Sequence, residues 1–269
     1  MIRDLLDLRP LGGDRFDALV PHYDYRPNLF GGQVAGQALR AAATTVAADR
    51  APHSFHSYFV RSGRLDVPLV MQVERVRDGR SFSVRGVEAL QEGEVVLDMV
   101  ASFHVTEAGP RSMQPMADVP PPEEGSPDEF HRVGAGSPTL DIRVVYEQDG
   151  PAQPPFGSML RYWVRSTESW PDDPGLAAAY AAYVADMRTG TGTMGTGERP
   201  SAGFMMASLD HSLWFHDRFR PEAWLLLDLR HVERGGNRGI VLGTMHTQDR
   251  RHVVTFAQEM LVRERRADG

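Results

Sequence analysis

The sequence contains neither cysteine nor lysine, and all 29 of its basic residues are arginine. Without cysteine the chain cannot form disulfide bonds, thiolate metal sites or a thiol nucleophile. Without lysine it can form neither a Walker-type phosphate loop nor a Schiff base. The formal net charge of −7 also disfavours binding to nucleic acid, which requires clustered positive charge. Thiol chemistry and lysine chemistry are therefore excluded, and we expect no nucleic-acid partner.

Long apolar runs are also missing. No stretch approaches the ~18 apolar residues of a membrane span, and the charged start Met1-Ile2-Arg3-Asp4 does not resemble a secretory signal. The 269 residues, 41% apolar and 24% charged, are typical of a globular protein with one large domain or two smaller ones. We therefore expect a soluble cytoplasmic protein that has no membrane partner.

Two similar segments recur along the chain and indicate an internal duplication. The aligned pairs are Gly79 with Gly236, Gln91 with Gln248, Val105 with Val262 and, at a slightly shorter shift, His56-Ser57 with His211-Ser212. These matches predict two copies of one fold, an N-terminal domain over residues 1–106 and a C-terminal domain over residues 137–269. Between them, residues 107–136 contain six prolines, which predicts a linker without regular structure.

Each copy has the same predicted order of elements. An Ala-rich helix comes first, starting after Phe30-Gly31-Gly32 in one copy and near Pro174 in the other. Both helices are apolar around most of their circumference, so each should be enclosed by other elements. Long β-rich segments separated by short turns follow each helix. The pattern predicts an α+β fold in which two antiparallel sheets each wrap around one central Ala-rich helix.

The stretch Gly190–Gly195 matches the pattern G-x-G-x-x-G of dinucleotide-binding proteins. That mechanism requires the glycines to follow a strand and to open a helix, whereas here they follow a predicted helix. We therefore expect a flexible loop near Asp186, and no nucleotide site.

Several separated blocks resemble the type II acyl-CoA thioesterases, and the resemblance covers nearly the whole chain. The blocks are Phe30–Gln37, His53–Phe59, Arg77–Phe82, Leu209–His216, Thr247–Asp249 and Gln258-Glu259. The resemblance implies a double hotdog fold and hydrolysis of fatty acyl-CoA to free fatty acid and CoA. It also implies acyl-CoA as the substrate partner, no metal or organic cofactor, and a homo-oligomer.

The resemblance further implies that three residues hold the hydrolytic water: Asp186, Ser208 and Gln258. Asp186 is the only charged residue between Gly175 and Met187, in a helix that otherwise appears buried. A lone carboxylate there must lose solvent, as catalytic carboxylates often do. A solvent-facing Asp at the end of the helix is the alternative, and the case for Ser208 rests on the resemblance alone.

The duplication provides an internal comparison for Gln258. By strand alternation Gln258 shares one face with apolar residues, and the matching position of the first copy is Ala101. A polar amide on a helix-facing side needs a hydrogen-bonding reason, although an exposed amide near a sheet edge remains an alternative. Since the first copy lacks counterparts of Asp186 and Gln258, we expect one active site per chain, where the copies meet.

Backbone N–H groups of Gly32 and Gln33, at the start of the first helix, are candidate donors to the thioester carbonyl oxygen. A tight entry to the helix is the simpler interpretation of the glycines. Two other functions stay open: a hotdog hydratase or dehydratase, and an acyl-CoA binding protein without catalysis. The former chemistry usually relies on an Asp/His pair, and no histidine lies near Asp186 in the sequence.

Overall fold

Most of the regular structure of the chain is β-strand. The computed structural model describes residues 1–18, 28–127, 139–145, 159–194 and 203–265, and for residue 159 only the backbone. The helices are α1 (Ile2–Leu5), α2 (Gly31–Thr44), η1 (Pro122–Glu124), α3 (Pro174–Ala185) and α4 (Thr189–Met194). The strands are β1 (Leu8–Gly12), β2 (Arg15–Ala18), β3 (Arg50–Phe59), β4 (Leu69–Asp78), β5 (Phe82–Gln91), β6 (Glu94–Val105), β7 (Ser126–Pro127), β8 (Leu140–Val144), β9 (Met159–Ser166), β10 (Phe204–Ser208), β11 (Asp210–Phe215), β12 (Leu225–Gly235), β13 (Arg238–Thr247) and β14 (His252–Glu264). None of these helices is long and apolar enough to cross a membrane.

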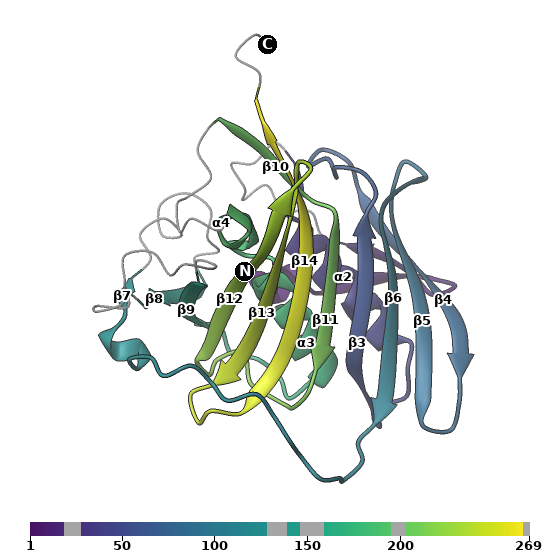
Figure 1. The fold of residues 1–269 in the computed structure, drawn as a ribbon. Helices are drawn as coiled ribbons and strands as arrows, with labels where there is room; N and C mark the ends of the chain where they lie inside the picture. The colour runs from purple at the N-terminus through teal and green to yellow at the C-terminus, as the bar shows by residue number, and fades with distance from the viewer. Residues whose placement is uncertain (19–27, 128–138, 146–158, 195–202, 266–269) are drawn as a thin grey trace.

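The strands form one continuous antiparallel sheet (Figure 1). Its order is β1-β2-β4-β5-β6-β3-β11-β14-β13-β12-β9-β8-β7, and β10 pairs separately with β14. The two halves of the chain meet where β3 pairs with β11, with Ser57 opposite His211. The sequence predicted two sheets. The structure instead joins them edge to edge, because β3 and β11 each use the open edge of the other half.

Helices α2 and α3 lie behind the central strands in Figure 1, and both are largely buried. Asp173 caps α3 by accepting a hydrogen bond from the Leu176 N–H (3.0 Å). The two helices pack closely, since a Cβ on Gly36 would lie 2.8 Å from the Ala179 carbonyl oxygen. Small residues therefore bring the two helices into direct contact, with the start of α2 beside the end of α3.

The predicted linker is packed against the C-terminal half. Met116 is buried against Trp163 and Leu226, and the Trp163 indole donates to the Pro120 carbonyl (3.0 Å). The expectation of a segment without regular structure is wrong over residues 122–124 and 126–127, which form η1 and β7. Residues 128–136 of the predicted linker lie outside the described residues.

The glycine-rich stretch after Asp186 is helical, so the expectation of a loop is wrong for its described part. Helix α4 covers Thr189–Met194, and residue 195 is not described. A Cβ on Gly192 would lie 3.0 Å from Val241 and 3.4 Å from Leu229, so the helix packs tightly on β12 and β13. This packing outweighs the low helix propensity of glycine.

Arg85 is a fully buried arginine in the first half. Its guanidinium donates to the Thr45 hydroxyl (2.8 Å) and the Thr45 carbonyl (3.0 Å), and it pairs with Asp78 (2.8 Å). Thr45 is the C-cap of α2, where the helix dipole favours a positive charge. Arg85 thus ties the end of α2 to the turn between β4 and β5.

Replacing Arg85 with Met is expected to destabilise the fold by about 2–3 kcal/mol, because buried acceptors at Thr45 lose their donors. Urea unfolding at neutral pH measures the change. The matched control is Arg77→Met on the neighbouring strand, where the side chain is exposed and stability should change little. Equal effects of the two substitutions would contradict the structural role assigned to Arg85.

Three histidines gather beside the linker at one end of the C-terminal half. The ring centroids of His216 and His252 are 4.6 Å apart, and those of His246 and His252 are 4.7 Å apart. Burial lowers the pKa of all three, and the neighbouring histidines reinforce this for His216 and His246. His246 also hydrogen-bonds the carbonyl of Gln114 in the linker (3.2 Å).

These lowered pKa values predict a loss of stability in mild acid. The unfolded chain binds protons on these rings below about pH 6.5, whereas the folded chain resists protonation until a lower pH. The stability that these neutral rings contribute is therefore fully present above about pH 6.5, and it declines as the pH falls from there through the lowered pKa values. Thermal melts between pH 8 and pH 5 should show the decline. The variant carrying both His216→Gln and His252→Gln should show a shallower decline than wild type or the surface variant His56→Gln.

Candidate active site

Asp186 is the C-cap of α3 and is 6% exposed. Its Oδ2 accepts a hydrogen bond from the backbone N–H of Gly32 in the first turn of α2 (2.7 Å). A Cβ on Gly32 would lie 2.6 Å from the Tyr183 carbonyl oxygen and 2.9 Å from the Asp186 Cβ, so only glycine fits. The helix packing thus holds the buried carboxylate against the positive end of α2.

Ser208 and Gln258 complete a hydrogen-bonded triangle with Asp186. The Gln258 Nε2 donates to Asp186 Oδ1 (2.6 Å) and to Ser208 Oγ (2.7 Å), and Ser208 Oγ donates to Asp186 Oδ1 (3.3 Å). Gln258 comes from β14 and Ser208 from the end of β10, which pairs with β14. The structure therefore brings together the three residues singled out as catalytic from three separate elements.

The alternatives of an exposed Asp186 and an exposed Gln258 are wrong. Gln258 is 1% exposed and Asp186 is surrounded by donors. A buried carboxylate with three donors, one of them a hydroxyl, can accept a proton from a water molecule and can orient that water. Nothing in the described part of the chain forms a cluster of three or more metal-ligating side chains.

The first half has different residues at the matching places. Thr45 caps α2 where Asp186 caps α3. Ala101 pairs with Arg85 across β6 and β5, whereas Gln258 pairs with Val241 across β14 and β13. Each of these cross-strand pairs thus contains one polar and one apolar residue. The polar residue is Arg85 in the first half and Gln258 in the second.

Gly32 and Gln33 lie at the start of α2, beside Asp186, but their N–H groups are engaged. The Gly32 N–H donates to Asp186, and the Gln33 N–H donates to the Phe30 carbonyl (3.1 Å). The Gln33 side chain is buried. The structure thus places Gly32 and Gln33 at the site, but neither backbone N–H is available to a thioester carbonyl oxygen in this arrangement.

His211 is a polar residue of the site that the sequence did not identify. It is fully buried in β11, and the Asp186 charge acts on its pKa, which burial lowers overall. The repeat alignment paired it with His56, yet His56 is exposed while His211 faces inward. The alignment is therefore wrong by one residue here, which reverses the face of a strand. The alternation of β11, with His211 and Leu213 on one face, is the signal that could have identified it.

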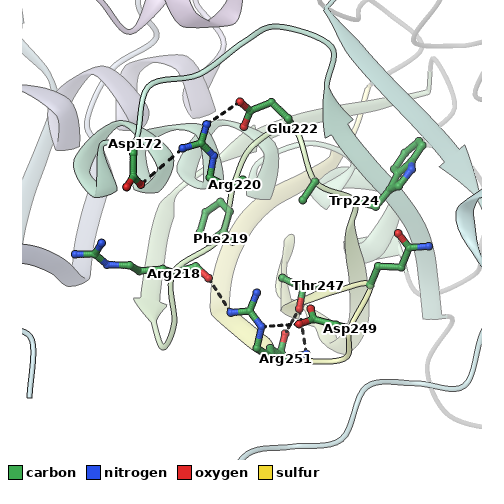
Figure 2. A pocket seen from close by; sticks show the side chains of 11 residues that line it. Asp172, Arg218, Phe219, Arg220, Glu222, Trp224, Thr247, Asp249 and Arg251 are labelled. Atoms are coloured by element: carbon green, nitrogen blue, oxygen red, sulfur yellow. Dashed lines mark hydrogen bonds and ion pairs between the residues drawn. The ribbon is translucent and has the colours of Figure 1, made fainter. Parts of the chain in front are cut away.

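A pocket of about 560 Å³ opens near the other end of α3 (Figure 2). Arg220 and Arg251 extend along it, but Glu222 and Asp249 pair with them (3.0 and 2.9 Å). The pocket lies at the turn between β13 and β14 and contains none of the five candidate site residues. It is therefore distinct from the triangle around Asp186.

Both halves of the chain match models of known protein families. Residues 21–104 match the family described as the acyl-CoA thioesterase N-terminal domain, and residues 110–262 match the acyl-CoA thioesterase C-terminal domain. Acyl-coenzyme A thioesterase 8 from Mus musculus is 35% identical, over 98% of this chain and 89% of the relative. Acyl-CoA thioesterase 2 from Haemophilus influenzae is 30% identical, over 87% of each chain.

Solved structures agree with this assignment. The acyl-CoA thioesterase II TesB2 from Mycobacterium marinum superposes with a TM-score of 0.84 at 34% identity, covering 98% of this chain and 99% of that one. A hot dog fold protein from Alicyclobacillus acidocaldarius superposes with a TM-score of 0.77 at 21% identity, covering 98% of each, and supports the fold alone. The chain has the hot dog fold and belongs to the acyl-CoA thioesterase family, whose members hydrolyse thioesters of coenzyme A.

Proposed function

We propose that the enzyme hydrolyses fatty acyl-CoA with a water molecule held by Asp186, Ser208 and Gln258. Asp186 takes a proton from the water as the water oxygen bonds to the thioester carbonyl carbon. The C–S bond then breaks, and the proton passes to the departing CoA thiolate. The products are a free fatty acid and CoA.

The observation that carries this proposal is the hydrogen-bonded triangle. Asp186 is the only acceptor-only group in it, whereas Ser208 and Gln258 supply donors that can hold a water in one orientation. A water entering the triangle would exchange one of the existing hydrogen bonds for its own. Such positioning is what general-base catalysis requires, because the base must lie within hydrogen-bond reach of the proton it removes.

The start of α2 is our candidate for the carbonyl oxygen. Negative charge develops on that oxygen as water attacks, and the positive end of a helix stabilises it. Because the Gly32 N–H donates to Asp186, the oxygen must either take over this donor or interact with the helix end as a whole. Gln33 lies in the same turn and is the second residue assigned to this role.

We further propose a double hotdog organisation with one site per chain. Residues 1–106 and 137–269 would each form a hotdog domain around α2 and α3, with residues 107–136 joining them. The two family matches and the helix caps Thr45 and Asp186 support this division. In the first half, Thr45 stands where Asp186 stands in the second half, and the side chain that contacts it is Arg85. The first half would therefore lack a catalytic carboxylate and a site of its own.

Release of free thiol from a panel of acyl-CoA thioesters tests the proposed function. We expect thiol release from fatty acyl-CoA, with the preferred chain length read from the panel. A hydratase is the second candidate, because the Asp186 charge acts on the buried ring of His211, so that a histidine lies near Asp186 in space although none lies near it in the sequence. Enoyl-CoA consumed without thiol release would favour the hydratase. Thiol release from every active thioester, with no hydration, supports hydrolysis.

A further inference from the structure

His211 and Gln258 are neighbours on adjacent strands. Strands β11 and β14 are antiparallel, and their paired residues Ser212 with Ala257 and Leu213 with Phe256 make His211 the next residue opposite Gln258. Both side chains face inward, with exposures of 0% and 1%. Neighbouring side chains on one face of an antiparallel pair lie within contact distance. The imidazole is therefore a neighbour, on the inward face of the sheet, of the amide that contacts Asp186.

Only the nitrogen of the Gln258 amide makes hydrogen bonds to the residues that the structure describes. Its Nε2 makes both hydrogen bonds of the triangle, while its Oε1 is buried and has no hydrogen-bond partner among the described residues. Both ring nitrogens of His211 are likewise buried and make no hydrogen bond of good geometry in that part of the chain, although Gln258 and the Ala182 carbonyl are near enough to raise the pKa of the ring. An amide oxygen left unpaired in the interior is costly, so a nearby N–H donor is strongly favoured as its partner.

The surroundings of His211 leave little room for another role. The rings of Phe55 and Phe256 lie 5.8 and 6.4 Å from the imidazole, centre to centre. Gln258 and the Ala182 carbonyl are the hydrogen-bonding groups that face the ring, and Asp186 and Asp210 are the charges near it. Neither ring nitrogen donates to Asp186 or Ser208, so the ring reaches the triangle only through its neighbour Gln258.

We propose that His211 is a positioning residue that donates a ring N–H to Gln258 Oε1. This hydrogen bond holds the amide with its Nε2 toward Asp186 and Ser208. A rotated amide would instead present its oxygen to the Asp186 carboxylate, and two acceptors would repel each other. His211 thereby fixes which end of the Gln258 amide faces Asp186, without touching the water or the substrate. The inference rests on the proposed role of Gln258 in holding the water.

Burial also sets the protonation state that this role needs. Desolvation lowers the pKa of His211, although Asp186, the Ala182 carbonyl, Asp210 and Gln258 each act to raise it. The ring is then neutral at neutral pH and has one N–H to donate. We assign that N–H to Gln258, because its Oε1 is buried and has no other donor in the described part of the chain.

A double-mutant cycle tests this inference. His211→Leu removes the donor and keeps an apolar side chain among the phenylalanines. We expect kcat to fall about tenfold with KM within a factor of two, since the misplacement concerns the water and not substrate binding. In the Gln258→Ala background, His211→Leu should have no further effect, because the amide it positions is gone. His211→Asn or His211→Gln should restore part of the rate, according to which ring nitrogen the new amide N–H replaces.

The controls separate this inference from the proposed function. His56→Leu, exposed on the neighbouring strand, should keep wild-type rates. If Gln258→Ala alone is fully active, the proposed role of Gln258 in holding the water and the inference are both wrong. If Gln258→Ala is impaired but His211→Leu lowers kcat equally in both backgrounds, or not at all, only the inference is wrong. Should His211→Leu fail to fold, the same cycle is run with whichever of His211→Asn and His211→Gln has the lower rate.

Discussion

Asp186→Asn is expected to lower kcat for thioester hydrolysis by about 10³-fold, within the range that a general base contributes. The amide has the shape of the carboxylate, and its oxygen can still accept from the Gly32 N–H, so the packing of α2 against α3 should persist. It cannot, however, take a proton from water. Steady-state thiol release measures the loss, and a thermal melt verifies that the fold is retained.

The matched control lies at the other end of the same helix. Asp173 caps the start of α3 and pairs with Arg40 (2.7 Å), well away from the triangle. Asp173→Asn keeps a good capping residue and should leave kcat within a factor of two. If Asp186→Asn retained more than a tenth of wild-type activity, Asp186 would not be the base.

Gln258→Ala is expected to lower kcat by about 10²-fold with little change in stability. The loss follows from the two hydrogen bonds that its Nε2 makes to Asp186 and Ser208. Two opposing effects keep the stability change within about 1 kcal/mol: a polar amide is removed from the interior, while Asp186 loses one donor. Parallel measurement of thermal melts and thiol release decides the matter.

The first half provides the reference for this prediction. Alanine already stands at the matching place in β6, where Ala101 is fully buried. A Gln258→Ala protein that is strongly destabilised yet hydrolyses acyl-CoA at the wild-type rate would identify Gln258 as a structural residue. Ala101→Ser changes the same inward face in the other half, and it should leave thiol release unaffected.

The sequence was sufficient for the elements that periodicity and composition define. The two Ala-rich helices, the long strands from β3 to β6 and the lone carboxylate Asp186 all follow from local pattern. Gln258 was identifiable because a repeat lets one half of the chain be compared with the other. Its inward direction required only the alternation of a strand.

What the sequence could not provide depends on register and packing between distant segments. His211 was aligned with His56, and a shift of one residue exchanges the inner and outer faces of a strand. The engagement of the Gly32 N–H by Asp186 depends on how α2 and α3 lie against each other. The helical state of α4, despite its glycines, depends on packing against β12 and β13. Arg85 was missed for a similar reason, because its partner Thr45 lies on a different element.

A structure of the enzyme with a non-hydrolysable acyl-CoA analogue would show whether Asp186, Ser208 and Gln258 hold the attacking water. We expect an ordered water within hydrogen-bond distance of Asp186, Ser208 and Gln258, about 3–3.5 Å from the carbon that replaces the thioester carbonyl carbon. A carbonyl carbon bound elsewhere, for example in the pocket beside Arg251, or a water held by other side chains, would contradict this expectation.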